Sequence, residues 1–223
     1  MSSPGETQSL LRLMAWLSPA FPVGGFAYSS GLERAVHDRL VTDAEGLRGW
    51  LSATLEAGTL WNDAVLLAGA ARAADDGRQL ADLSELGLAL AGSTERHLET
   101  LSLGRAFLAA ASAWPHPVMA LLPRDCPYPV AVGAVASAHG VPTEQALAAF
   151  LHAALSQGVS ASIRLGVCGQ QQGVAILADL EARVAEAAGR AAAATLDDLG
   201  TSTVQADIAS MRHETQHSRL FRS

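Results

Sequence analysis

The residues best suited to catalysis stand near the end of the chain, where His213-Glu214-Thr215-Gln216-His217 matches the zinc-protease pattern H-E-x-x-H. On a helix the two imidazoles would share one face and hold zinc, while the glutamate could act as a general base. Zinc hydrolases usually take a third ligand from further along the chain, and the residues after His217 contain no His, Asp, Glu or Cys. We therefore favour solvent-facing histidines, with a metal hydrolase using residues 213–217 as the alternative.

The other residues capable of chemistry do not show the spacing of a catalytic or metal site. The two cysteines, Cys126 and Cys168, are most simply small buried hydrophobes, with a labile Cys–His nickel site as the alternative. All 15 basic residues are arginines. Without lysine the chain can form neither a Walker A phosphate loop nor a Schiff base. A nucleotide that matters to this protein is therefore expected on a partner. The scattered histidines, read as surface or capped residues, are His37, His97, His116, His139 and His152.

Composition indicates a cytoplasmic globular protein. The 223 residues are 49% hydrophobic and 17% charged, which suits one domain with a sizeable core. A net charge of −7 argues against binding to nucleic acid or to an anionic membrane. Two cysteines and a start without a basic, apolar leader fit a reducing compartment. The longest uncharged stretch, 106–123, contains Pro115 and Pro117, which would break a membrane-spanning helix.

Helical periodicity dominates the elements that must position these residues. Apolar side chains recur at i, i+3, i+4 and i+7 within 10–17, 47–55, 147–155 and 176–184. We predict an all-α fold, a single compact domain over 1–223 with about ten helices. Segment 128–135 is rich in valine, but its alanines and Gly133 fit a closely packed helix as well. Asp63, beside an apolar run, is either a helix cap or a buried polar partner. Thr42 is expected to begin the second periodic helix.

Two segments break this periodicity. The N-terminal loop, 18–33, combines two prolines, two adjacent glycines and aromatic side chains, so it is too apolar for a solvated loop. The C-terminal tail, 211–223, keeps Leu220 and Phe221 between arginines, although chain ends usually turn polar. We interpret both as partner-docking segments. Between 164 and 173 an arginine, three amides and three glycines predict a polar break between two helices.

These segments also carry a resemblance. The chain resembles the urease accessory protein F family, UreF, over nearly its whole length. Val167-Cys168-Gly169-Gln170 stands where the family carries proline-leucine-glycine-glutamine, which is a departure from its pattern. The matching residues are Leu17-Ser18-Pro19, Phe21-Pro22-Val23-Gly24, Phe26, Tyr28-Ser29, Gly31-Leu32-Glu33, Tyr128-Pro129-Val130-Ala131 with Gly133, Arg164, Gly166, Gln170, His213-Glu214 and Arg219-Leu220-Phe221-Arg222-Ser223.

The resemblance implies a non-enzymatic, all-helical adaptor, commonly a homodimer. Such a protein binds the D-type (also called H-type) urease accessory protein and the G-type GTPase, and the complex inserts nickel into apo-urease. Nickel is then the cargo and GTP is bound by the partner, so this chain is expected to hold no cofactor. The partner-binding residues implied are Phe21, Pro22, Gly24, Phe26, Tyr28, Ser29, Gly31, Glu33, Arg164, Gln170, His213, Glu214, Arg219, Leu220, Phe221 and Arg222.

Three finer hypotheses follow from this reading. The tail is expected to order on binding, with Leu220 and Phe221 as anchors. Regulation of the partner's GTP hydrolysis is a further expectation, with Arg34 and Arg164 as candidates for assisting it, although surface salt bridges are the simpler role for both. Weak, transient contact of Ni²⁺ with His213 and His217 stays open, because imidazole suits nickel. A helical scaffold unrelated to nickel is a third function class.

Overall fold

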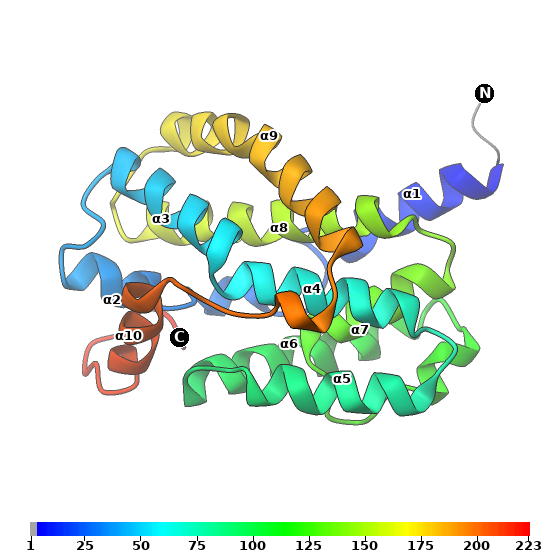
Figure 1. Cartoon of the computed structure of the whole chain (residues 1–223). Helices are drawn as coiled ribbons and strands as arrows, with labels where there is room; N and C mark the ends of the chain where they lie inside the picture. The colour runs from blue at the N-terminus through cyan, green and yellow to red at the C-terminus, as the bar shows by residue number, and fades with distance from the viewer. Residues whose placement is uncertain (1–3) are drawn as a thin grey trace.

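The computed structural model describes residues 4–223, and over this range the protein is all-α, as predicted. Ten α-helices and three short 3-10 helices make up the described chain (Figure 1). The helices are Pro4–Trp16 (α1), Leu32–His37 (α2), Ala44–Ala57 (α3), Thr59–Arg72 (α4), Gly77–Ala89 (α5), Thr94–Ala111 (α6), Tyr128–Ala138 (α7), Thr143–Arg164 (α8), Gln170–Ala193 (α9) and Val204–His213 (α10), with the 3-10 helices Gly25–Ala27 (η1), Pro117–Ala120 (η2) and Leu196–Asp198 (η3).

Helices α4 and α7 pack against each other at the centre of the core. The valine-rich segment 128–135 is therefore a helix, and it is buried from Pro129 to Ala136. Close approach depends on Gly133, because a Cβ there would lie 2.2 Å from the Leu67 carbonyl oxygen of α4. The prediction that small residues let these helices approach closely is confirmed at this crossing.

The other helices form layers around this pair. In Figure 1, α5 and α6 lie below α4, and α8, α9 and α3 lie above it. Helix α8 is long and apolar enough to cross a membrane by length and composition. In this structure α8 is a core helix, because Leu147, Leu151 and Leu155 on one of its faces are buried.

Local signals place most helix ends. The polar break is confirmed, since α8 ends at Arg164 and α9 begins at Gln170. The expectation for Thr42 is wrong by one residue: Asp43 is the cap of α3, and its carboxylate accepts a hydrogen bond of 2.9 Å from the Gly46 N–H. A carboxylate at this position satisfies an unpaired first-turn N–H and complements the helix dipole.

The loop and the tail meet at one end of the molecule. Figure 1 shows α2, α10 and the C-terminus side by side, and the bonds between α2 and the tail agree with this view. The N-terminal part of α1 lies at the opposite end (Figure 1). Segments separated by nearly the whole chain therefore form one surface.

Candidate partner-docking site

The H-E-x-x-H residues do not form a metal site. Helix α10 ends at His213, so the second histidine does not follow on the same helical face. Glu214 instead accepts a hydrogen bond of 2.7 Å from the Thr94 N–H at the start of α6, and His217 is exposed. Within residues 4–223 no cluster of three or more His, Cys, Asp or Glu side chains could hold a metal ion. The geometry of these residues therefore does not support the metal hydrolase alternative.

Removal of metal ions is expected to leave this protein unchanged. Chelation with EDTA should shift the midpoint of thermal unfolding by no more than about 1 °C, because no described cluster couples folding to a bound metal. Circular dichroism melting before and after dialysis measures this, and metal analysis of the same samples is the control. A fall of several degrees together with loss of one zinc per chain would contradict the expectation.

Glu33 of α2 holds the tail. Its carboxylate accepts hydrogen bonds from the Leu220 N–H at 2.7 Å and from the Phe221 N–H at 2.9 Å. The same carboxylate lies 3.0 Å from Nε2 of His213. Burial by itself raises the pKa of Glu33, but the bonds from Leu220, His213 and Phe221 outweigh it and hold the pKa below its usual value. Because the docked carboxylate stays ionised to lower pH, this contact stabilises docking above the ordinary carboxyl range and is lost as pH falls through the lowered pKa.

His213 lies between two carboxylates. Its side chain is fully buried, and Nδ1 lies 2.6 Å from Glu95 at the start of α6 while Nε2 faces Glu33. Each carboxylate oxygen can accept a hydrogen bond from an imidazole N–H. Glu95 also pairs with Arg219 of the tail at 2.5 Å. The histidine therefore joins three segments of the chain, and the expectation that it faces solvent is wrong.

The contact between the loop (18–33) and the tail (211–223), here called the junction, extends to the end of the tail through hydrogen bonds of the main chain. The Arg222 N–H donates to the Ala27 carbonyl at 2.8 Å, and the Ser29 N–H donates to the Ser223 carbonyl at 2.9 Å. The Ser30 N–H also donates to the Ser223 hydroxyl at 3.3 Å. These bonds satisfy backbone groups of both segments that lie outside helices, so they fix the register of the tail on the loop.

Arg164 covers the junction from the end of α8. Its guanidinium donates a hydrogen bond of 2.6 Å to the Phe26 carbonyl and stacks 4.2 Å from the centre of the Phe221 ring. Phe221 itself is only 4% exposed. Two expectations therefore change: the tail is ordered without a partner, and Phe221 is an anchor within its own chain. Leu220, 52% exposed, is an apolar side chain near the end of the tail that is left for a partner.

Gln157 supports the loop from within α8. Its amide donates hydrogen bonds to the Gly25 carbonyl and, at 3.3 Å, to the Tyr28 carbonyl. Any side chain on Gly25 would collide with this amide, because a Cβ would lie 2.4 Å from the Gln157 oxygen. Gly25, the second of the two adjacent glycines noted in the sequence, thus lets the loop lie directly against α8.

Gly31 brings α10 close to α2. It caps α2 with φ of 82°, a left-handed conformation that favours glycine. A Cβ at this position would lie 3.0 Å from the Ser210 amide nitrogen of α10. Both the backbone angle and the contact therefore require glycine.

A buried polar layer lies beneath the junction. Glu99 of α6 accepts hydrogen bonds of 2.9 Å from the Ser30 hydroxyl and 2.8 Å from the Ser223 hydroxyl. Arg96 lies 3.6 Å from the same carboxylate and also pairs with Asp63 of α4. Of the two roles left open for Asp63, the structure therefore shows the polar partner, with a side chain that is 14% exposed.

The structure brings most residues implied by the resemblance together. Phe21 is an exception, since its ring packs in the core against Phe107 and Trp114. Gln170 is another: it is exposed at the start of α9 and, within residues 4–223, makes no hydrogen bond to the loop or tail. Sequence reasoning missed three residues because they have partners more than a hundred positions away, namely Glu95, Glu99 and Gln157.

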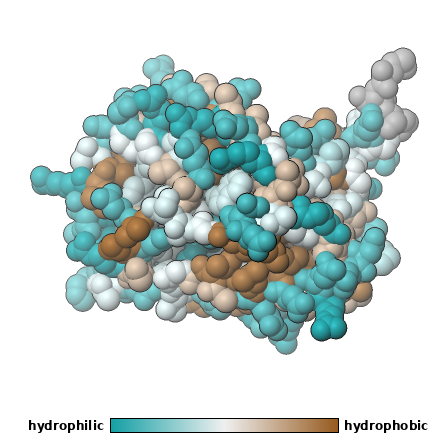
Figure 2. Space-filling view, in the orientation of Figure 1, coloured by the Kyte–Doolittle hydropathy of each residue, from teal (hydrophilic) through white to brown (hydrophobic). Residues whose placement is uncertain are grey.

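The junction presents apolar side chains to solvent. Phe26 is 76% exposed on the loop, and Leu220 is exposed on the tail. Ile208 and Met211 of α10 are also exposed. Figure 2 shows an apolar patch beside α10, and another beside η3, on an otherwise hydrophilic face. Exposed apolar side chains on ordered segments are typical of protein-binding surfaces.

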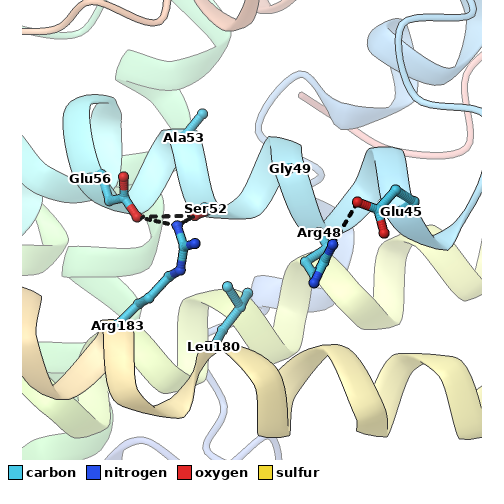
Figure 3. Close-up of a pocket in the computed structure, with 8 residues that line it drawn as sticks. All are labelled: Glu45, Arg48, Gly49, Ser52, Ala53, Glu56, Leu180 and Arg183. Atoms are coloured by element: carbon cyan, nitrogen blue, oxygen red, sulfur yellow. Dashed lines mark hydrogen bonds and ion pairs between the residues drawn. The ribbon is translucent and has the colours of Figure 1, made fainter.

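A surface hollow of about 380 Å³ between α3 and α9 offers no comparable site. Figure 3 shows that both arginines in it are already paired: Arg48 with Glu45 at 2.5 Å, and Arg183 with Glu56 at 2.6 Å. The cations of this hollow are therefore neutralised, and they do not indicate a phosphate site.

Comparison with known proteins gives the family. The sequence model of the UreF family matches residues 41–181. The chain is 64% identical to the urease accessory protein UreF of Agrobacterium fabrum and 62% identical to that of Rhizobium johnstonii. It is 58% identical to that of Rhizobium meliloti, and each alignment covers 100% of both chains. The full-length alignments include the loop and the tail, which lie outside the matched 41–181 region. The chain therefore belongs to the UreF family of urease accessory proteins.

Proposed function

We propose that this protein is a cytoplasmic, non-enzymatic adaptor in urease maturation. It joins the D-type accessory protein and the G-type GTPase on apo-urease, and the assembly inserts nickel. The junction of the loop and the tail is its docking surface, and the functional chain is a homodimer. Nickel passes through the assembly as cargo, and the G-type partner binds the GTP.

One observation supports the docking role above others. The loop and the tail are held as one ordered surface by buried Glu33, while Phe26 and Leu220 stay exposed on it. Binding through a surface that is already ordered loses less conformational entropy than binding through a disordered tail. Large apolar side chains on such a surface are the usual anchors of an interface.

We propose that the docking surface, when bound in the assembly, regulates GTP hydrolysis by the G-type partner. Arg34 is engaged with Asp38 at 2.7 Å, and Arg164 is engaged with Phe26 and Phe221. Either arginine would have to leave these contacts in order to reach a nucleotide on a partner. The GTPase rate of the complex with and without this protein measures the regulation.

Charged substitutions of the exposed anchors test the docking surface. Phe26→Asp and Leu220→Asp are each expected to weaken binding of the D-type protein by about tenfold or more, since burial of an unpaired carboxylate is unfavourable. Binding is measured by biolayer interferometry with the purified D-type protein. Leu11→Asp on α1, also an exposed leucine, is the matched control and should bind normally. Equal binding by all three variants, with unchanged helicity, would remove this surface from the interface.

A further inference from the structure

His139 lies where helix α1 meets the body of the protein. The Ser9 hydroxyl donates to the His139 carbonyl at 3.2 Å, and Arg12 lies 3.2 Å from Nδ1 of the imidazole. The indole of Trp16 packs on the same ring, with centroids 5.3 Å apart. Nε2 of His139 lies 3.2 Å from the Trp114 carbonyl on the segment after α6. One side chain thus links α1, the end of α7 and that segment.

These partners dictate the protonation state of the ring. Arginine can only donate a hydrogen bond and a carbonyl oxygen can only accept one. His139 must therefore accept from Arg12 at Nδ1 and donate to Trp114 from Nε2, which is the neutral, singly protonated imidazole. A second proton would sit on Nδ1 and point at the guanidinium. The hydrogen bond to α1 would be lost, and two positive charges would face each other.

The surroundings favour the neutral form. Burial lowers the pKa of His139, and the charges of Arg12 and His116 lower it further, against the opposing effect of the Trp114 carbonyl. Arg12 comes from α1, and His116 comes from the segment before η2, where its ring lies 5.1 Å from that of His139. Within residues 4–223, Arg12 and His116 are the charged and titratable groups that act on the imidazole.

We propose that His139 is a pH-sensitive switch that holds the first turns of α1 against the body while it is neutral and releases them when it takes up a second proton. Trp16 and Leu13 are buried and keep the last turn of α1 in place in both states. The released part carries Leu10 and Leu11, which are exposed apolar residues. Protonation therefore changes whether the segment that carries these two leucines is docked on the body of the protein. The switch is independent of the docking surface proposed above.

The sign of the effect follows from the lowered pKa. The released state, with the ordinary histidine pKa of about 6.5, takes up a proton before the docked state does. Docking of α1 is therefore fully present above this value and weakens as pH falls below it.

Hydrogen exchange measures the switch directly on the full chain. Amide protection of peptides covering residues 4–12, corrected for intrinsic exchange rates, is expected to fall about tenfold between about pH 7.5 and about pH 5.5. His139→Gln keeps one donor and one acceptor but does not titrate, so its protection should not change with pH. His152→Gln, which replaces an exposed histidine of α8, is the matched histidine control and should retain the response. No pH response in the unmodified chain, or an equal response in His139→Gln, would overturn the proposal.

A second variant covers the case in which His139→Gln does not fold. Arg12→Gln keeps a donor toward Nδ1 but removes the positive charge, so the titration midpoint of His139, followed by NMR of its ring protons, should rise. The response of α1 to pH should shrink in parallel. An unchanged midpoint in Arg12→Gln would show that the imidazole and the guanidinium are not coupled, and the proposal would fail.

Discussion

Replacing Glu33 by glutamine is expected to release the tail and to weaken binding of the D-type accessory protein by about a hundredfold or more. The carboxylate accepts hydrogen bonds from two tail N–H groups and also faces His213. A glutamine amide has one oxygen, and its NH₂ group would face a donor. Losing charge-assisted hydrogen bonds worth about 1.5–3 kcal/mol each therefore favours release of the tail. Hydrogen exchange of residues 215–223 measures release, and calorimetry measures binding.

The two measurements separate the structural claim from the functional one. Release of the tail with normal partner binding would show that Glu33 docks the tail but that the docked tail is not part of the interface. Unchanged protection of the tail would contradict the structural role itself. Glu45→Gln removes an exposed, ion-paired carboxylate from α3 and is the matched control. It should alter neither quantity, because exposed ion pairs contribute about 0–1 kcal/mol.

Replacing Gly133 by alanine is expected to lower the free energy of unfolding by about 3 kcal/mol or more. The added Cβ would lie 2.2 Å from the Leu67 carbonyl oxygen and 3.0 Å from its carbonyl carbon. Both are main-chain atoms of α4 at the centre of the core, so the two helices would have to move apart. Alanine has a helix propensity about 1 kcal/mol more favourable than that of glycine, but this gain is smaller than the packing loss. Urea unfolding followed by circular dichroism gives the difference.

Gly49 provides the opposite control within the same protein. It lies in the interior of α3, and a Cβ at this position would meet no atom within 4 Å. Gly49→Ala should therefore stabilise the chain by up to about 1 kcal/mol through helix propensity alone. If both substitutions shifted the urea midpoint in the same direction, the close α4–α7 crossing would not be the cause.

Local patterns determined the helices and the unusual segments. Apolar spacing depends on the 3.6-residue repeat, which neighbours along the chain already carry, so the stripes at 47–55 and 147–155 predict α3 and α8 correctly. The composition of 18–33 and of 211–223 is also a local property, so the sequence alone identified both segments as breaks in the helical periodicity. The resemblance to UreF, carried by the same residues, is confirmed by the family match and the full-length relatives.

The tertiary structure decided what those segments touch. His213 meets Glu33 and Glu95, which are 180 and 118 positions away along the chain. No local spacing encodes such contacts, so the sequence suggested a zinc motif where the structure has a buried histidine between two carboxylates. Phe221 is buried and Leu220 is exposed although they are adjacent, because the docked main chain turns one side chain inward and the other outward. Periodicity follows from local geometry, whereas burial and pairing depend on which distant surfaces pack together, and that is settled when the whole chain folds.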